Sequence, residues 1–278
     1  MAEGFAPDIM QNEFPGHPVF SNKAKRTIAR DMLERYTGSR LSLFRKQIIL
    51  TNFDYYLQRF KIMGEAISYV GSVMNVCHSK LLDVSMIDFS IGSPPAALII
   101  ELISVVDPKA VLFLGMCGGL HRSLKVGDFI LPIAAIRDEG VTQHFMPPQV
   151  PALPTFKVQK FVSQILVEKN RDYRTGVIHT TDYRFWEFNE AFKHKIYTEK
   201  AIGIDMECAS LFIGGFASKV PIGALLLVSD LPLKRKGIKT KKSASRVFRR
   251  FTDIHLEVGV KAMSEIAGRG EHIRHYRW

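Results

Sequence analysis

An apolar strand that ends in a carboxylate is the feature that most constrains how this chain can fold. Residues 222–228 read Ile-Gly-Ala-Leu-Leu-Leu-Val, and the run stops at Ser229-Asp230-Leu231-Pro232. A strand without polar alternation is covered on both faces, as in the parallel sheets of α/β proteins. Ligands of such sheets bind beyond the carboxyl ends of the strands. We therefore expect Asp230 at the floor of a pocket, where partial burial raises the pKa of its carboxyl group.

A second carboxylate, Glu207, precedes Asp230 by about the length of one helix. Two acids beside one pocket suit general acid catalysis combined with charge stabilisation. A structural alternative stays open at this point. In that alternative Asp230 caps a turn before Pro232, and Glu207 is a solvated helix residue.

Composition indicates a folded α/β protein. The chain has 278 residues, 46% hydrophobic and 23% charged, and neither a repeat nor a composition shift marks a second domain. No apolar run approaches the roughly 20 residues of a membrane helix, and the N-terminus lacks the pattern of a signal peptide. Cys77, Cys117 and Cys208 are far apart and lack metal-type spacing. We expect a cytoplasmic protein without a metal or other cofactor.

The net charge of +11 fits either a nucleic acid or a small anionic substrate. The densest basic stretch, residues 234–250, follows Asp230 directly instead of forming a terminal arm. It lacks interleaved aromatic residues and a helix-turn-helix pattern. We expect a small anionic ligand and no nucleic-acid or membrane partner, although a solvated loop and helix face would explain the same charges.

Residues 1–45 resemble an N-terminal extension, and residues 46–278 form the predicted catalytic domain. The first twenty residues are rich in Pro and Gly, and a helix is expected over 23–36. From residue 47 onward strands and helices alternate. Predicted strands cover 47–51, 86–91, 110–114, 128–131 and 222–228, and predicted helices cover 94–106, 155–169, 187–197, 206–219 and 245–267.

Two glycine-containing turns are candidate ligand contacts. Residues 114–120 read Leu-Gly-Met-Cys-Gly-Gly-Leu, which lets the backbone approach a ligand closely and present N–H groups to it. The spacing matches neither a dinucleotide fingerprint nor a P-loop. In the second turn, Ser93 is the predicted N-cap and Pro94 the first helical residue. That turn is a structural helix start first and an anion site second.

Two further segments combine cations with other useful groups. Residues 180–187 place Arg184 beside Phe185 and Trp186, which suits stacking on a planar base; core packing of either aromatic ring is the alternative. Arg137 could bind a phosphate with its forked guanidinium or pair with a surface acid. The Pro-rich residues 145–154 are expected to pack as an ordered loop.

In this order the motifs resemble the nucleoside phosphorylase and nucleosidase superfamily, and within it the bacterial AMP nucleosidases. The resemblance covers roughly residues 45–275. It is carried by residues 92–94, 115–120, 127–132, 136–140, 180–182 with 186–187, 205–207 and 228–230.

The resemblance implies a mixed sheet surrounded by helices and a homohexamer built as a trimer of dimers. It also implies roles. Asp230 matches the acid that protonates purine N7, Glu207 the carboxylate that grips the ribose hydroxyls, and Met206 the residue beneath the sugar. The loop of Arg184, Phe185 and Trp186 matches the base-stacking segment. The other candidate substrate-binding residues are Asn52, Ser93, Cys117, Gly118 and Ser229.

Departures from the family pattern favour hydrolysis over phosphorolysis. Phosphorylases of this superfamily hold free phosphate with an Arg two residues before the glycine at 115 and a Ser or Thr directly after it. Here these positions are Phe113 and Met116, and Tyr56 replaces a phosphate-binding Arg near the first strand. The long AMP nucleosidases carry a regulatory domain for which this chain is too short, so allosteric control of that kind is not expected.

The leading hypothesis is hydrolysis of AMP to adenine and ribose 5-phosphate. Glycosidic cleavage passes through an oxocarbenium-like state, which a protonated Asp230 and a negative Glu207 would assist. Glu139 is the predicted activator of the water, unless it fixes a loop instead. Arg137 and Arg184 are expected to bind the 5′-phosphate, with residues 234–242 adding positive field. The alternatives are a nucleoside phosphorylase and a non-catalytic basic binding protein.

Overall fold

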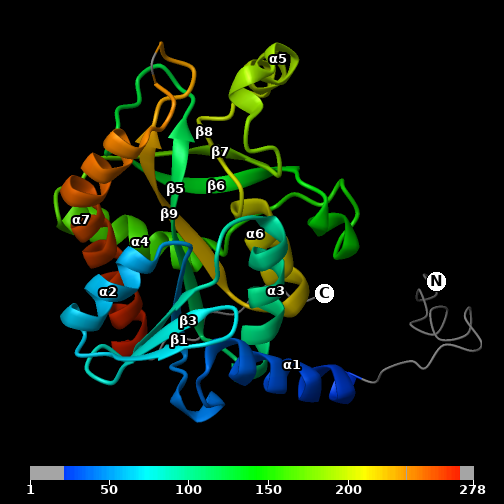
Figure 1. Ribbon diagram of the computed structural model, residues 1–278, viewed down its shortest axis with the longest axis vertical. Helices are drawn as coiled ribbons and strands as arrows, with labels where there is room; N and C mark the ends of the chain where they lie inside the picture. Colours follow the sequence, from blue (N-terminus) through cyan, green and yellow to red (C-terminus); the bar gives the residue numbers. More distant parts are fainter. Residues whose placement is uncertain (1–21, 236, 270–278) are drawn as a thin grey trace, which may run out of the picture.

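A nine-stranded mixed sheet organises the molecule (Figure 1), and the predicted α/β class with a single domain is confirmed. The computed structural model describes residues 22–235 and 237–269. The strands are β1 (Gln47–Thr51), β2 (Ile67–Val70), β3 (Asn75–Ser79), β4 (Val84–Asp88), β5 (Ala110–Gly119), β6 (Phe129–Asp138), β7 (Tyr173–Thr181), β8 (Gly203–Asp205) and β9 (Ile222–Asp230). The helices are α1 (Asn22–Thr37), α2 (Asp54–Met63), α3 (Ser93–Ile103), α4 (Phe156–Glu168), α5 (Glu190–Glu199), α6 (Cys208–Ser218) and α7 (Lys241–Gly268).

The sheet closes on itself at one end. Its strand order is β2-β3-β4-β1-β5-β8-β7-β6-β9, and β9 also pairs with β5. Strands β5 to β9 thus form a closed barrel, in which the β5–β8 and β6–β9 pairs are antiparallel. Strands β4, β1, β5 and β9 run parallel to their neighbours in that series. Their carboxyl ends therefore open on the same edge of the sheet.

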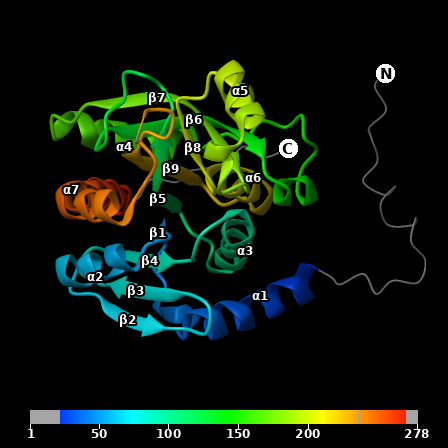
Figure 2. The same cartoon turned by 45° about the horizontal axis from the view of Figure 1, so that its top comes forward.

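Strand β9 is covered on both faces, as its uniform apolar sequence predicts. Leu226 and Val228 belong to a core that includes residues of α3 and α6. Leu225 and Leu227 face a second core, to which α2, α4 and α7 contribute. Figure 2 shows these two groups of helices on opposite sides of the central strands. Burial of alternate residues in different cores explains why no polar residue interrupts the strand.

The glycine cluster differs from the expected ligand-facing turn, because strand β5 continues through it to Gly119. Its pairing with β9 extends as far as Gly118 opposite Asp230. A Cβ atom at Gly115 would lie 2.3 Å from the ring of Phe113. The glycine at this position thus makes room for a core side chain, while the backbone stays in the sheet.

Other element boundaries were only partly predicted. The elements α2, β2, β3, β7 and β8 were not predicted; β7 contains three Thr residues and β8 has only three residues in all. Helix α3 begins at Ser93, and Gly92 with a φ of 102° is its N-cap. Ser93 is thus not the N-cap that was expected. Helix α5 begins at Glu190, after Asn189 caps it.

Helix α1 is docked on the domain. Leu33 is fully buried in the core that α3 and α6 share, and Lys25 forms an ion pair with Glu101 of α3. The first twenty residues of the expected extension lie outside the described residues. None of the described helices is long and apolar enough to span a membrane.

Candidate active site

A cavity opens at the carboxyl ends of β5, β8 and β9, where the fold predicts a ligand site. It is walled by the end of β1, the loop between β7 and α5, and the segment between β9 and α7. The lining residues are Asn52, Phe53, Ile91, Met116, Cys117, Gly118, Thr181, Tyr183, Arg184, Trp186, Glu187, Ile204, Asp205, Met206, Glu207, Ser229, Asp230, Pro232 and Lys239. Nine of the thirteen candidate residues named above are in this set, and the other four are Ser93, Arg137, Glu139 and Phe185.

A β-bulge turns Asp230 into the cavity. Cys117 pairs with Val228 and Gly118 with Asp230, so Ser229 is an extra residue on β9. Bulges of this kind re-aim side chains at the rims of sheets. The Ser229 hydroxyl donates a hydrogen bond of 2.6 Å to Asp230 Oδ1. Burial raises the pKa of Asp230, and the hydrogen bond from Ser229 opposes that shift in part.

Glu207 is buried, which rules out the solvated helix residue of the structural alternative. It is 2% exposed and occupies the N-cap position of α6. Its Oε1 accepts hydrogen bonds from Asn52 Nδ2 at 3.1 Å and from the Gly92 amide at 2.8 Å. Burial, reinforced by the nearby charge of Asp205, raises the pKa of Glu207 to about 8.

Asp205 and Thr180 support this wall of the cavity. Thr180 Oγ1 donates to Asp205 Oδ1 at 2.6 Å, and the Cys208 amide donates to Oδ2 at 2.8 Å. Burial raises the pKa of the Asp205 carboxyl group. Sequence reasoning included both residues in family motifs but assigned neither a role. The Asp-x-Glu spacing at 205–207 is the signal that could have found Asp205.

The Ser93 hydroxyl also supports this wall, although the residue does not line the cavity itself. It donates a hydrogen bond of 2.7 Å to the Met206 carbonyl. Ser93 therefore fixes the backbone beneath a lining residue. Its expected direct contact with substrate stays a prediction without a matching position in the cavity wall.

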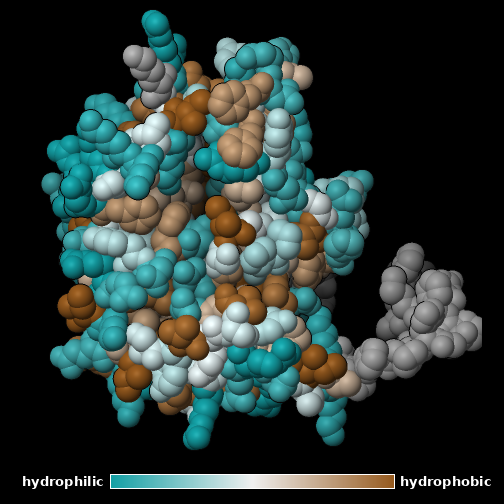
Figure 3. All heavy atoms as spheres, viewed as in Figure 1, coloured by the Kyte–Doolittle hydropathy of each residue, from teal (hydrophilic) through white to brown (hydrophobic). Residues whose placement is uncertain are grey.

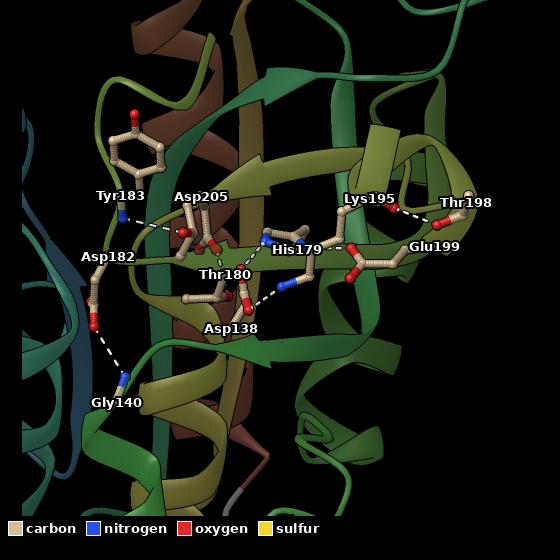
Figure 4. Close-up of polar contacts among 11 residues, drawn as sticks. Asp138, Gly140, His179, Thr180, Asp182, Tyr183, Lys195, Thr198, Glu199 and Asp205 are labelled. Atoms are coloured by element: carbon tan, nitrogen blue, oxygen red, sulfur yellow. Dashed lines mark hydrogen bonds and ion pairs between the residues drawn. The ribbon is translucent and has the colours of Figure 1, made fainter. Parts of the chain in front are cut away.

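A buried histidine outside the cavity anchors α5. His179 Nδ1 lies 2.6 Å from Glu199 Oε2, and its Nε2 lies 3.1 Å from Asp138 Oδ2. Lys195 of α5 also pairs with Asp138. Figure 4 shows the imidazole between the two carboxylates, next to Thr180 and Asp205. This cluster, which sequence reasoning missed, joins α5 to β6 and β7.

The loop before α5 presents one aromatic ring to the cavity and turns another away. Trp186 is buried in the cavity wall and packs on Phe192, with ring centroids 5.9 Å apart. Phe185 is 66% exposed and lies outside the lining. Phe185 was expected to stack on a base, and this role stays a prediction, because its ring lies outside the cavity lining in the described structure. Arg184 lies over the Phe185 ring at 5.8 Å and reaches the cavity rim.

Among the described residues of the basic stretch 234–250, Lys239 is the cation that lines the cavity. Its Nζ contacts Met116 Sδ at 3.7 Å and lies 5.7 Å from the centre of the Phe53 ring. Burial lowers the pKa of Lys239, while the negative charge of Asp230 acts in the opposite direction. The sequence indicated positive charge near residues 234–242 but did not single out this residue.

The expected phosphate ligand Arg137 does not reach the cavity. Its guanidinium donates five hydrogen bonds: two to Thr142, at Oγ1 and at the carbonyl, and one each to the carbonyls of Met146, Pro147 and Val150. All of its donor directions are thus used to hold the Pro-rich loop. In the described structure Arg137 binds this loop, and its expected role as a phosphate ligand stays a prediction.

Glu139 belongs to the same loop and not to the cavity. Its Oε2 accepts from the Thr142 amide at 3.0 Å, and its Oε1 accepts from the Thr142 hydroxyl. This matches the alternative in which Glu139 fixes a loop. Its expected role in activating the water stays a prediction that no contact in the described structure supports.

The residues that replace phosphate ligands of phosphorylases lie mainly in the core. Phe113 is fully buried, and Tyr56 is buried with its hydroxyl 2.7 Å from His255 Nδ1. Met116 alone of the three lines the cavity. Within residues 22–235 and 237–269, no group of three or more His, Cys, Asp or Glu residues is placed to hold a metal ion.

The known proteins that this chain resembles include nucleosidases and phosphorylases. Residues 50–258 match the phosphorylase superfamily. AMP nucleosidase of Escherichia coli K12 is 28% identical over 286 residues, which cover 87% of this chain but 59% of that protein. The chain thus spans about three fifths of that relative. The crystal structure of AMP nucleosidase from Bacteroides thetaiotaomicron matches with a TM-score of 0.78 and 38% identity, covering 88% of this chain and 99% of that one. Purine nucleoside phosphorylase from Toxoplasma gondii, at 19% identity and a TM-score of 0.72, shares the fold.

Proposed function

This chain belongs to the phosphorylase superfamily, and we propose that it hydrolyses the N-glycosidic bond of AMP to give adenine and ribose 5-phosphate. The observation that carries the proposal is the presence of two carboxyl groups, the half-buried Asp230 and the buried Glu207, in the wall of one cavity. The similarity to two AMP nucleosidases supports this substrate over others of the superfamily.

Asp230 is the proposed general acid. Burial raises the pKa of its carboxyl group, which favours the protonated form that can donate to purine N7. As the bond between ribose C1′ and purine N9 breaks, its electron pair moves into the ring and the proton at N7 neutralises the leaving group. Water supplies the oxygen that bonds to C1′. Such assistance is typically worth ~100- to 10,000-fold in rate.

Glu207 is the proposed ligand of the ribose hydroxyls. Asn52 and the Gly92 amide hold its Oε1 in place. Loss of the Glu207 proton gives a carboxylate that accepts from both hydroxyls and faces the developing positive charge of the sugar. Met206, next in the chain, lines the cavity beneath this position.

The 5′-phosphate is proposed to interact with Lys239, because this cation lines the cavity. Lys239 also supports a second candidate function. Its ammonium group contacts Met116, the position where phosphorylases hold free phosphate, so it could bind that ion in a phosphorolytic reaction. The side chains of Met116 and Phe113 offer no oxyanion ligand, and for that reason hydrolysis stays the first choice.

Product analysis separates these functions. AMP and adenosine would each be incubated with the protein, with and without inorganic phosphate, and the products separated by chromatography. Hydrolysis predicts ribose 5-phosphate from AMP without added phosphate. A strict phosphate requirement with a sugar 1-phosphate as product would establish phosphorolysis. Release of no base, together with salt-sensitive binding of duplex DNA, would favour the non-catalytic basic protein.

A homohexamer in a reducing, cytoplasmic compartment is also proposed. The exposed apolar side chains Ile67, Val70 and Val73 on and beside β2 support assembly, because apolar surface of this kind marks contact sites. Apolar surface is visible on the lower half of the face in Figure 3, where β3 is labelled in Figure 1. Light scattering would measure the mass. The free, buried state of the three cysteines is compatible with the compartment.

A further inference from the structure

Glu187 carries a buried carboxylate oxygen that has no partner in the described structure. The residue lies in the 3-10 turn at Trp186–Phe188, and its side chain is 4% exposed. Its Oε1 accepts a hydrogen bond of 3.0 Å from Arg184 Nη1, whereas Oε2 is buried without a hydrogen-bond partner. An unsatisfied buried acceptor is costly, and each instance in a native protein calls for an explanation.

The cavity supplies the explanation, because Glu187 lines it together with Asp230. The two carboxyl groups interact, since the charge of Glu187 contributes to the raised pKa of Asp230. Asn52 Oδ1 is another unpartnered buried atom in the lining. Asn52, however, is bonded to Glu207 at the proposed sugar end. Glu187 therefore belongs with the base end of the cavity.

We propose that Glu187 selects the purine by its substituent at position 6, with Oε2 accepting a hydrogen bond from an exocyclic amino group. This inference rests on the proposed function, in which Asp230 meets N7 of the purine. Position 6 is next to N7 on the ring edge, so a second carboxylate near Asp230 can reach its substituent.

The chemistry of the carboxylate sets the direction of selection. An ionised carboxylate accepts hydrogen bonds and donates none, and Glu187 forms an ion pair with Arg184. A 6-amino group satisfies Oε2. A 6-oxo group would place one oxygen against another and leave Oε2 unpaired, which sites built for a donor reject strongly. The cavity thus favours 6-aminopurines over 6-oxopurines.

Three nucleotides that differ only at position 6 test this inference: AMP with an amino group, IMP with an oxo group, and purine riboside 5′-monophosphate with hydrogen. The unmodified protein is expected to show a kcat/KM for AMP at least about 100-fold above that for IMP. Glu187→Gln, whose amide can donate as well as accept, is expected to narrow this ratio to about 10-fold or less. Cleavage of purine riboside 5′-monophosphate is expected to change little, because that substrate makes no contact at position 6.

Glu190→Gln is the matched control, because the Glu190 side chain is 87% exposed three residues away. It is expected to leave all three rates unchanged. Glu187→Asp keeps the acceptor and is expected to retain part of the preference, which a purely structural role would not predict. If Glu187→Gln lowered kcat/KM equally for all three substrates, the residue would act in folding or in the chemical step, and the inference would be overturned.

Binding of free adenine and hypoxanthine, measured by calorimetry, keeps this test separate from the proposed function. If AMP is cleaved but Glu187→Gln preserves its preference over IMP, the inference fails and the function stands. If no nucleotide releases a base, the function fails. In that case adenine binding that exceeds hypoxanthine binding, and loses this preference in Glu187→Gln, still supports the inference, whereas equal binding of the two bases overturns it.

Discussion

At the scale of single residues, Asp230 and Glu207 are two acids that the fold treats differently. Asp230 lies at a bulge with Ser229 as a hydrogen-bond donor, and the positive charges of Lys239 and Arg184 also oppose the rise in its pKa. Glu207 is buried beside another carboxylate, Asp205, and the pKa of Glu207 rises to about 8. Different surroundings are what allow two carboxyl groups in one cavity to take different roles.

Replacing the acid tests its role directly. Asp230→Asn is expected to retain the fold and bind AMP but to lose about 100- to 10,000-fold in kcat, because an amide cannot deliver the proton. Release of adenine, followed by chromatography, measures the loss. Asp172→Asn, at an exposed position, is the control. Turnover within a few-fold of the unmodified protein would remove Asp230 from the acid role.

Glu207 is expected to make stability depend on pH. Its pKa is about 8 when folded and near 4.5 when unfolded, so between these values the folded chain keeps a proton that the unfolded chain has released. The free energy of unfolding therefore falls as pH rises through this range, by up to about 1.4 kcal/mol per unit. Glu207→Gln has no such proton and is expected to show a smaller fall.

Urea unfolding at several pH values between 5 and 9 measures this difference. Asp205 contributes with the same sign, since burial also raises its pKa, so some pH dependence is expected to remain in Glu207→Gln. Glu190→Gln, on the surface, is expected to follow the unmodified protein. If the unfolding free energies of the unmodified protein and Glu207→Gln differ by the same amount at every pH, Glu207 is ionised throughout the range.

At the scale of elements, the carboxyl end of β6 holds a neighbouring loop and helix in place. Arg137 holds the loop after β6 through five hydrogen bonds, and Glu139 holds Thr142 in the same loop. His179 of β7 links Glu199 of α5 to Asp138 at the same end of β6. These contacts fix the segments on both sides of the strand that leads to Trp186 and Glu187.

Arg137→Ala is expected to affect stability and not substrate preference. Loss of the guanidinium leaves several backbone carbonyls without donors, which predicts a fall of roughly 2–4 kcal/mol in the free energy of unfolding. Chemical denaturation would measure this fall, with the exposed Arg171→Ala as control. The ratio of kcat/KM for AMP to that for adenosine is expected to stay unchanged. A selective loss of AMP cleavage would restore Arg137 as a phosphate ligand.

At the scale of the whole molecule, the chain has a formal net charge of +11. Lys239 and Arg184 are cations in the cavity wall. A positive field raises the rate at which anionic ligands reach a site. AMP is an anion, whereas adenosine is neutral. The charge balance of the chain therefore bears on the capture of the nucleotide more than on the chemical step.

Salt is expected to separate the two substrates. Raising the ionic strength from about 0.01 M to about 1 M shortens the screening length from roughly 30 Å to roughly 3 Å. The kcat/KM for AMP is expected to fall several-fold over this range, while that for adenosine changes little. Steady-state rates at matched pH provide the measurement. A parallel fall for both substrates would indicate a general effect of salt on the protein.

Local sequence patterns were enough to predict a sheet that is covered on both faces and a ligand site at the carboxyl ends of its strands. An apolar run such as residues 222–228 is a local pattern, and only burial on both faces suits it. The carboxylates at 207 and 230 and the order of the glycine, threonine and serine motifs were likewise readable as sequence, and they pointed to the superfamily that residues 50–258 match.

Which side chains meet in the cavity wall depends on tertiary contacts. The bulge at Ser229 depends on the register of β9 against β5, and no local pattern encodes that pairing. Arg137 and Phe185 looked suited to a ligand, yet Arg137 binds the loop that follows its own strand and Phe185 is exposed to solvent. Glu187 lay in a family motif without an assigned role and Lys239 in a basic stretch, and the fold brings both into the cavity wall. The physical reason is that secondary structure follows from short-range periodicity, whereas the direction and neighbours of a side chain depend on contacts far along the chain.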